Sequence, residues 1–219
     1  MLNVGCLHTA QSNIAVFEAA RRALKLDDVM LKHRVRADLL SAAERAGKPT
    51  PAIIEDCASE LVSLAKGVDG VLLTCSTLGA SAPRAAAMLD VPALRVDEAL
   101  ANEAVRRGGS VIVLCATRTT IGPTRAVFEA AAMATGAGVE VRLVPGAWEL
   151  FSAGREDVYL DAIAEAADAA VAEGATTIAL AQASMAGAAA RTRRVTPLTS
   201  PGAGLAAIVA AAQAAAKSS

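Results

Sequence analysis

The chain has 219 residues, of which 54% are hydrophobic and 20% are charged, so it can bury a substantial core and is not intrinsically disordered. Its formal net charge of −1 argues against nucleic acid or a membrane surface as a partner. An aromatic content of 2% argues against a platform that stacks bases or sugars.

Targeting signals and cysteine spacing bear on the cellular compartment. Residues 1–6 lack the basic and apolar regions of a signal peptide, and the longest apolar stretch, residues 205–212, is too short to cross a bilayer. The four cysteines are Cys6, Cys57, Cys75 and Cys115. They form no CxxC pair, and the chain has only two histidines, so no metal site is expected. We therefore expect a cytoplasmic protein with free thiols.

Predicted strands and helices alternate along the first half of the chain. Short apolar runs predict strands at residues 3–7, 29–35, 71–73 and 92–96. Helical periodicity predicts helices at residues 14–24, 37–46, 51–66, 82–89 and 97–107. Asp97 is expected to cap the last of these helices.

The pattern starts again after the Gly108-Gly109 break. Strands are predicted at residues 111–116, 139–144, 177–181 and 197–199. Helices are predicted at residues 122–135, 157–173 and 201–217. Residues 117–120 and 182–185 are expected to be polar turns.

The two halves contain an internal repeat. The five residues VFEAA at 16–20 recur at 127–131, and the segment 71–76 has a counterpart at 178–183. The offset is roughly 105–111 residues, as expected for a duplicated βαβ unit. This predicts an α/β fold of two pseudo-symmetric parallel-sheet lobes with a cleft between them. The first lobe is expected to comprise residues 1–99 and 205–219, and the second residues 100–204.

Cys75 lies at a position of the predicted fold where ligand binding and catalysis are expected. It follows the buried strand at 71–73 and precedes a predicted helix. The carboxyl end of a parallel strand is where α/β folds bind ligands, and a helix start favours a thiolate. Cys75 is thus a candidate acid/base or nucleophile, although the residues alone are equally consistent with a small core residue. The other three cysteines are expected in the core.

Polar turns follow the predicted strands in both halves. Their hydroxyl, amide and backbone N–H groups, with few charges, suit a small carboxylate. The residues expected to bind it are His8, Thr9, Ser12, Asn13, Ser76, Thr77, Thr117, Thr119, Thr120, Ala183 and Ser184. His8 is either a second acid/base or a structural residue. Trp148, Phe151 and Tyr159 either line the cleft or pack in the core.

Three motifs resemble those of the aspartate/glutamate/hydantoin racemase superfamily. They are Thr74-Cys75-Ser76-Thr77, the segment 115–120, and the segment 180–186. The resemblance implies a duplicated α/β fold and cofactor-independent chemistry, in which one cysteine removes an α-proton and a second returns one on the other face. Here the second position is Gln182, and an amide does not transfer protons near neutral pH. Gln182 is therefore expected to donate a hydrogen bond to a carboxylate or enediolate oxygen.

The resemblance leaves several activities open. The first is a racemase-like isomerase acting at carbon next to a carboxylate or carbonyl, with Cys75 as the single thiol. Arylmalonate decarboxylases, which resemble this fold, also keep one cysteine, but at the other position. Maleate isomerase-like members use a cysteine as a nucleophile. A non-catalytic protein that binds a small carboxylate is the further alternative. Because relatives are often dimers, a homodimer is also open.

Overall fold

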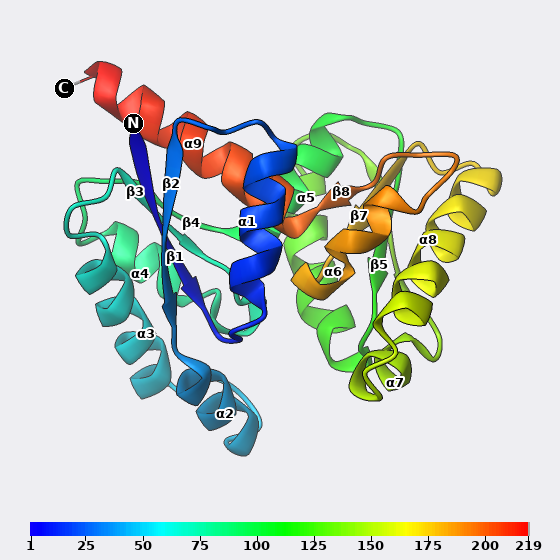
Figure 1. Cartoon of the computed structure of the whole chain (residues 1–219), viewed down its shortest axis with the longest axis horizontal. Coiled ribbons are helices and arrows are strands. Elements are labelled where there is room, and N and C mark those ends of the chain that lie inside the picture. Colours follow the sequence, from blue (N-terminus) through cyan, green and yellow to red (C-terminus); the bar gives the residue numbers. More distant parts are fainter. Residues whose placement is uncertain (219) are drawn as a thin grey trace. The chain divides into compact units, whose positions relative to one another are not determined.

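The computed structural model of the protein describes residues 1–218 (Figure 1). The contacts of the chain divide it into two compact units. The first unit comprises Met1–Val96 and the chain from Gly204 onward, and the second comprises Asp97–Ala203. Each unit contains a four-stranded, fully parallel sheet with flanking helices, which confirms the predicted α/β fold class.

The first sheet has the strand order β2-β1-β3-β4. Its strands are β1 (Leu2–His8), β2 (Val29–Val35), β3 (Gly70–Leu73) and β4 (Ala93–Arg95). The helices of this unit are α1 (Asn13–Ala23), α2 (Ala37–Arg45), α3 (Pro51–Leu64), the 3₁₀ helix η1 (Ser76–Leu78), α4 (Ser81–Ala86) and α9 (Ser200–Ser218). The strands read as apolar runs because both faces of a parallel sheet are covered.

Successive side chains of each strand point to opposite faces of this sheet. Leu7 and Leu73 pack with Leu64 of α3 in one cluster, on the face that α3 and α4 cover (Figure 1). On the opposite face, α1 places Phe17 against His8, with ring centroids 5.1 Å apart. The C-terminal helix α9 covers the same face, where Ile208 packs against Gly70.

The second sheet repeats this topology with the order β6-β5-β7-β8. Its strands are β5 (Ser110–Cys115), β6 (Gly138–Leu143), β7 (Thr177–Leu180) and β8 (Leu198–Thr199). Its helices are α5 (Val96–Arg106), α6 (Arg118–Ala132), α7 (Ala147–Ser152), α8 (Glu156–Ala172) and the 3₁₀ helix η2 (Ala183–Ala190). Gly108 and Gly109 join α5 to β5 with φ of 74° each, a conformation that favours glycine.

The sequence repeat corresponds to equivalent places in the two units. Phe17 in α1 and Phe128 in α6, the aromatic residues of the two VFEAA copies, are both buried. Leu7 pairs with Leu73 in the first sheet as Leu114 pairs with Leu180 in the second. Residues 73 and 180 are therefore equivalent, which supports the alignment of the halves expected from the sequence.

Some predicted elements differ from the observed ones. Helix α6 begins at Arg118, four residues before the expected start, and contains Pro123 in its second turn. Asp97 lies in the first turn of α5 instead of capping it, and its Oδ1 accepts a hydrogen bond from the Glu98 N–H (3.0 Å). The expected turn after β7 is the eight-residue 3₁₀ helix η2. Short helix α7 was not expected.

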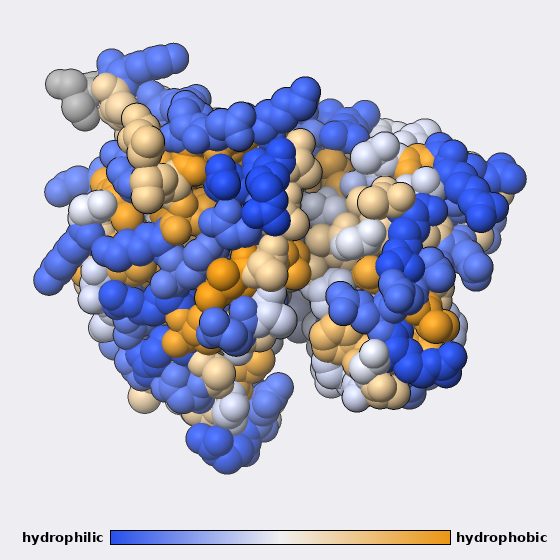
Figure 2. Space-filling model, in the orientation of Figure 1, coloured by the Kyte–Doolittle hydropathy of each residue, from blue (hydrophilic) through white to orange (hydrophobic). Residues whose placement is uncertain are grey.

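Within residues 1–218, no helix combines the length and the apolar character needed to cross a membrane. The most hydrophobic candidates are alanine-rich helices, whose small side chains pack in the unit cores. The outer side of α8 is covered by hydrophilic side chains (Figure 2).

Candidate active site

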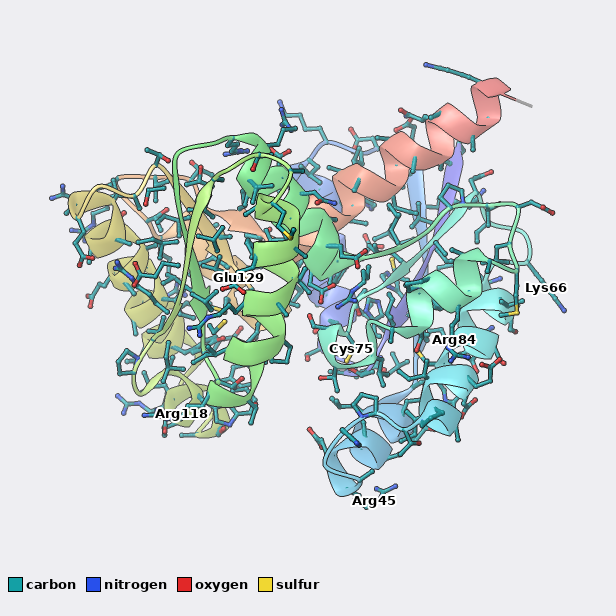
Figure 3. The ribbon with its side chains drawn as sticks, turned by 180° about the vertical axis from the view of Figure 1, so that it is seen from behind. Arg45, Lys66, Cys75, Arg84, Arg118 and Glu129 are labelled. Atoms are coloured by element: carbon teal, nitrogen blue, oxygen red, sulfur yellow. The ribbon has the colours of Figure 1, made fainter. Side chains whose placement is uncertain are left out.

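Cys75 lies at the carboxyl edge of the first sheet, two residues beyond the end of β3 (Figure 3). Its backbone is extended (φ −113°, ψ 111°), and η1 begins at the next residue. Cys75 is 9% exposed, whereas Cys6, Cys57 and Cys115 are each 0% exposed. All four cysteines are buried, and Cys75 is the least buried of them.

The surroundings of Cys75 are largely apolar. Its side chain joins the core cluster that contains Leu78 of η1 and Cys57 of α3. Burial raises the pKa of the Cys57 thiol, and the neighbouring Cys75 raises it further. Cys57 therefore stays a neutral thiol near pH 7. The helix after Cys75 has only three residues, so a helix dipole contributes less here than the sequence implied.

The residue before Cys75 anchors a chain of buried hydrogen bonds. The Thr74 hydroxyl donates to the Leu7 carbonyl oxygen (3.0 Å), so His8 Nδ1, 2.9 Å away, must donate to Thr74 Oγ1. His8 Nε2 then accepts from His33 Nδ1 (2.8 Å). His33 Nε2 lies 3.3 Å from Glu18 Oε1. These side chains form a line from a carboxylate on α1 to the residue beside Cys75, and His33 Nε2 donates to Glu18 only when it carries a proton.

His8 is fully buried and both of its ring nitrogens are occupied. Burial, together with the nearby His33, lowers the pKa of His8 to about 4, so the ring is neutral at pH 7. In this arrangement neither nitrogen is available to a substrate. The structure therefore places His8 behind the sheet edge, as a partner of Thr74.

Gln182 occupies the place in the second unit that Cys75 occupies in the first. It follows the end of β7 by two residues and precedes η2. Its Oε1 accepts a hydrogen bond from the Ala116 N–H (2.6 Å), which fixes the orientation of the amide. Among residues 1–218 the amide nitrogen has no hydrogen-bond partner, so its two N–H groups remain as donors.

The start of α6 carries a group of linked hydroxyls. Thr120 donates to the Thr117 carbonyl oxygen (2.9 Å), so the Thr117 hydroxyl donates to Thr120 Oγ1 (3.0 Å). Thr119 is exposed and reaches Thr117 Oγ1 at 3.5 Å. Thr117 is the N-cap residue of α6, but its side chain makes no capping bond. Figure 3 shows Arg118 at this start and Glu129 farther along the helix.

Cys115 and Ser184 face the interior of the second unit. The Cys115 thiol donates to Thr124 Oγ1 (3.8 Å), and burial raises its pKa. Ser184 Oγ lies 2.8 Å from the hydroxyl of Tyr159, which is 0% exposed. Burial raises the pKa of Tyr159 to about 12. Cys115 and Ser184 therefore contribute to the packing of the second unit.

The remaining predicted site residues lie at the carboxyl edges of their own sheets. Thr9 is buried after β1, Ser12 is exposed, and Asn13 is the half-buried first residue of α1. Ser76 is half-buried and Thr77 exposed in η1, and Ala183 is half-buried at the start of η2. Each unit thus brings its predicted residues to one edge.

The aromatic residues divide between core and surface. Phe151 packs against buried Tyr159 with ring centroids 5.1 Å apart. Trp148 stacks on Phe151 (5.3 Å) and is 44% exposed.

A hollow of about 410 Å³ lies elsewhere in this unit, between α5 and α6. Its lining is Glu98, Ala101, Asn102, Ala126, Val127, Ala130 and Ala131, none of which belongs to the strand edges.

Sequence reasoning missed the partners of the predicted residues. Thr74, His33 and Glu18 were not predicted to form one chain with His8. The sequence contained part of this information, because alternate residues of one strand, such as Cys6 and His8, lie on the same face of the sheet. Which residue of β2 joins them depends on the pairing of Cys6 with His33, and that register is a property of the folded sheet.

Two like α/β units, each with a polar side chain two positions beyond its third strand, define a duplicated parallel-sheet protein. The sequence model of the Asp/Glu/Hydantoin racemase family matches residues 15–217, and the chain belongs to this family. Membership supports the assignment of the chain as an isomerase. No curated protein matches the sequence.

Solved structures show the same fold. The aspartate racemase of Picrophilus torridus is 12% identical, with a TM-score of 0.70 over 97% of this chain and 95% of that chain. Allantoin racemase from Pseudomonas fluorescens is 17% identical, with a TM-score of 0.66 over 99% and 91%. Glutamate racemase from Thermus thermophilus is 19% identical, with a TM-score of 0.58 over 97% and 81%.

Proposed function

We propose that the protein is a cofactor-independent isomerase that transfers a proton at a carbon next to a carboxylate or carbonyl, with Cys75 as its only reacting thiol. The observation that carries this proposal is the position of Cys75, the least buried of the four cysteines, at the carboxyl edge of β3. Family membership supplies the reaction class. The substrate is proposed to be a small carboxylate.

The chemistry requires a base for the α-proton and donors for the charge that develops. In this proposal the Cys75 thiolate takes the proton, and the electron pair of the broken C–H bond passes into the adjacent carboxyl or carbonyl group. The resemblance to the racemases assigns Gln182 the place of the second cysteine, and its amide N–H groups, unpaired within residues 1–218, are the donors proposed for an enediolate oxygen. A well-placed donor of this kind contributes roughly 3–4 kcal/mol to transition-state stabilisation. The uncapped start of α6 supplies further N–H donors.

A single thiol limits the outcome of the reaction. Position 182, where the two-cysteine racemases have their second thiol, holds an amide that cannot supply a proton. Cys75 therefore returns the proton to the face of the carbanion from which it came. Alternatively, where the substrate contains a double bond, that bond shifts before the proton is returned. We expect exchange of the α-hydrogen with solvent to be faster than inversion of configuration.

A decarboxylase is the second candidate, because one acid is sufficient for it. Loss of CO₂ from a substituted malonate leaves the electron pair on the enediolate, and the Cys75 thiol donates one proton to carbon. Water then restores the thiol. A single thiol at the edge of β3 suits this reaction as well as it suits one-sided proton transfer.

Incubation in D₂O with a panel of α-substituted carboxylic acids tests the proposal. Deuterium at the α-carbon, measured by NMR and lost in Cys75→Ala, is the expected result. The matched control is Cys57→Ala, which removes a thiol of the same core cluster that is fully buried. A parallel panel of substituted malonates, followed by CO₂ release, distinguishes the decarboxylase. Binding of the acids without exchange or turnover would instead identify a carboxylate-binding protein.

A further inference from the structure

A cluster of three metal-ligating side chains lies on one face of the first sheet. Cys6 and His8 are alternate residues of β1, and His33 of β2 is the register partner of Cys6. The Cys6 sulfur and one ring nitrogen from each histidine all lie within 4.8 Å of one another. Helix α1 covers this face and contributes Phe17 and Glu18 beside the rings.

The outer nitrogens of both imidazoles already have acceptors. His8 Nδ1 donates to Thr74 Oγ1, whose own proton is used by the Leu7 carbonyl. His33 Nε2 faces Glu18 Oε1 at 3.3 Å. The inner nitrogens, His8 Nε2 and His33 Nδ1, are 2.8 Å apart and point toward each other. Metal-binding histidines have this arrangement, in which the second ring nitrogen is held by a carboxylate or another oxygen.

We propose that Cys6, His8 and His33 bind one transition metal ion of the Zn²⁺ class. Thiolate and imidazole are the ligands that suit such an ion, and three protein ligands leave one position for water. Binding forms one metal–sulfur and two metal–nitrogen bonds. The Cys6 proton leaves to solvent, and the His33 proton between the rings moves to Nε2, facing Glu18.

The electrostatics of the cluster suit a divalent cation. A thiolate at Cys6 and the carboxylate of Glu18 supply two negative charges near the ion, although Glu18 also pairs with Arg21 and Arg22. Burial raises the pKa of the Cys6 thiol to about 12, so the ion itself must displace the Cys6 proton. Glu18 is held in place by Arg21, whose Nε lies 3.0 Å from Oε2. Burial of the ligands strengthens this attraction, since Cys6 and His8 are 0% exposed.

Binding requires the two rings to move apart and the Cys6 sulfur, within 4.8 Å of the ring nitrogens, to come within bonding distance of the ion. Bonds of about 2.0–2.1 Å from a tetrahedral zinc place two ligand nitrogens about 3.3 Å apart. The two rings therefore need to separate by roughly half an ångström from their hydrogen-bonded distance. The side chain of His33 is 14% exposed and gives the ion a route of entry.

The test uses the untagged full-length chain, stripped with a chelator and dialysed against Zn²⁺, or against Co²⁺ as a spectroscopic probe. We expect one equivalent of metal per chain. With Co²⁺ we also expect a near-ultraviolet sulfur-to-metal charge-transfer band. The band should vanish in Cys6→Ser, and His33→Gln should weaken binding at least about tenfold. Because His33 is partly exposed, His33→Gln tests the site even if Cys6→Ser fails to fold.

Cys57→Ser is the matched control, because it removes a buried thiol of the same unit that is outside the cluster, and it should bind metal normally. Substoichiometric binding, or absence of the sulfur band, would overturn the proposal. So would equal affinity in His33→Gln and the unaltered chain, which indicates adventitious binding. The site uses neither Cys75 nor Gln182, so its failure would leave the proposed isomerase activity untouched.

Discussion

Cys75 and Gln182 occupy the same position in two separate sheets. Each follows, by two residues, a strand that pairs with the central strand of its unit at the same register, Leu73 with Leu7 and Leu180 with Leu114. The duplicated fold thus presents a thiol at one edge and an amide at the equivalent edge. The functional predictions depend on this difference.

Replacement of Cys75 by alanine should remove the base while leaving the fold intact. The side chain packs in a core cluster, but Ala removes only its sulfur, so the cavity left is small. We expect α-hydrogen exchange to fall by about 10²–10⁴-fold, the range for loss of a general base. NMR in D₂O measures the rate, and thermal unfolding verifies the fold. Exchange that persists unchanged in Cys75→Ala would exclude this residue.

Gln182→Cys should restore a second acid/base group at the equivalent position. A thiol there can protonate the carbanion from its own side, so inversion of configuration should increase relative to exchange. Chiral chromatography of the product measures the ratio. Gln182→Ala is the control, because it also removes the bond to the Ala116 N–H but adds no acid. An equal ratio in the two variants would contradict the assignment of position 182.

Acid should destabilise the first unit through Glu60. Burial raises the pKa of its carboxyl group, but hydrogen bonds from Arg34 and Arg36 outweigh this effect and leave the pKa below its ordinary value. The folded state therefore binds its proton less readily than the unfolded state. The resulting stability is present above about pH 4.3 and is lost as the pH falls through the folded value.

Urea unfolding at a series of pH values measures this effect. Glu60→Gln should lower the free energy of unfolding at pH 7 by about 1 kcal/mol and flatten its fall in acid. Glu55→Gln is the control, because its pair with Arg84 is more than half exposed on both sides. A pH profile that is identical in Glu60→Gln and the unaltered chain would refute the prediction.

Removal of either partner of the Tyr159–Ser184 hydrogen bond should destabilise the second unit, but by different amounts. Ser184→Ala leaves the fully buried Tyr159 hydroxyl without its partner, at a cost of about 1–3 kcal/mol. Tyr159→Phe leaves only a half-buried serine, which water can reach, so its cost should be smaller. Chemical denaturation of both variants gives the comparison. A larger loss in Tyr159→Phe would contradict this account.

Much of the fold could be predicted because buried parallel strands appear as short apolar runs. Strand β2 has the predicted bounds, and β1 and β3 differ from theirs by a residue or two. The start of α6 could not be placed, because Gly122-Pro123 has the composition of a helix start but lies within the helix. Such a proline costs one helical hydrogen bond, which the packing of Phe128 offsets.

The sequence predicted where the candidate site residues lie, but not which of them form hydrogen bonds with one another. Strand ends place Cys75 and Gln182 at sheet edges, because parallel strands end on the same side. Their roles stay predictions. The orientation of His8 depends on which strands pair and in which register, and a single sequence does not contain that information. For the same reason the spacing of Cys6, His8 and His33 gave no indication of a cluster.

The assignment of α9 to the first unit affects how the protein is made. Ile208 packs against Gly70, and Gly204 approaches Leu72, so the last helix completes a layer begun by the first strands. Residues 97–203 form one uninterrupted segment, so all of the second unit leaves the ribosome before the last helix is complete. The face of the first sheet that α1 and α9 share is therefore completed only after the residues from 204 onward have been made. A nascent chain that stalls before residue 204 lacks the helix that packs against Gly70 and Leu72.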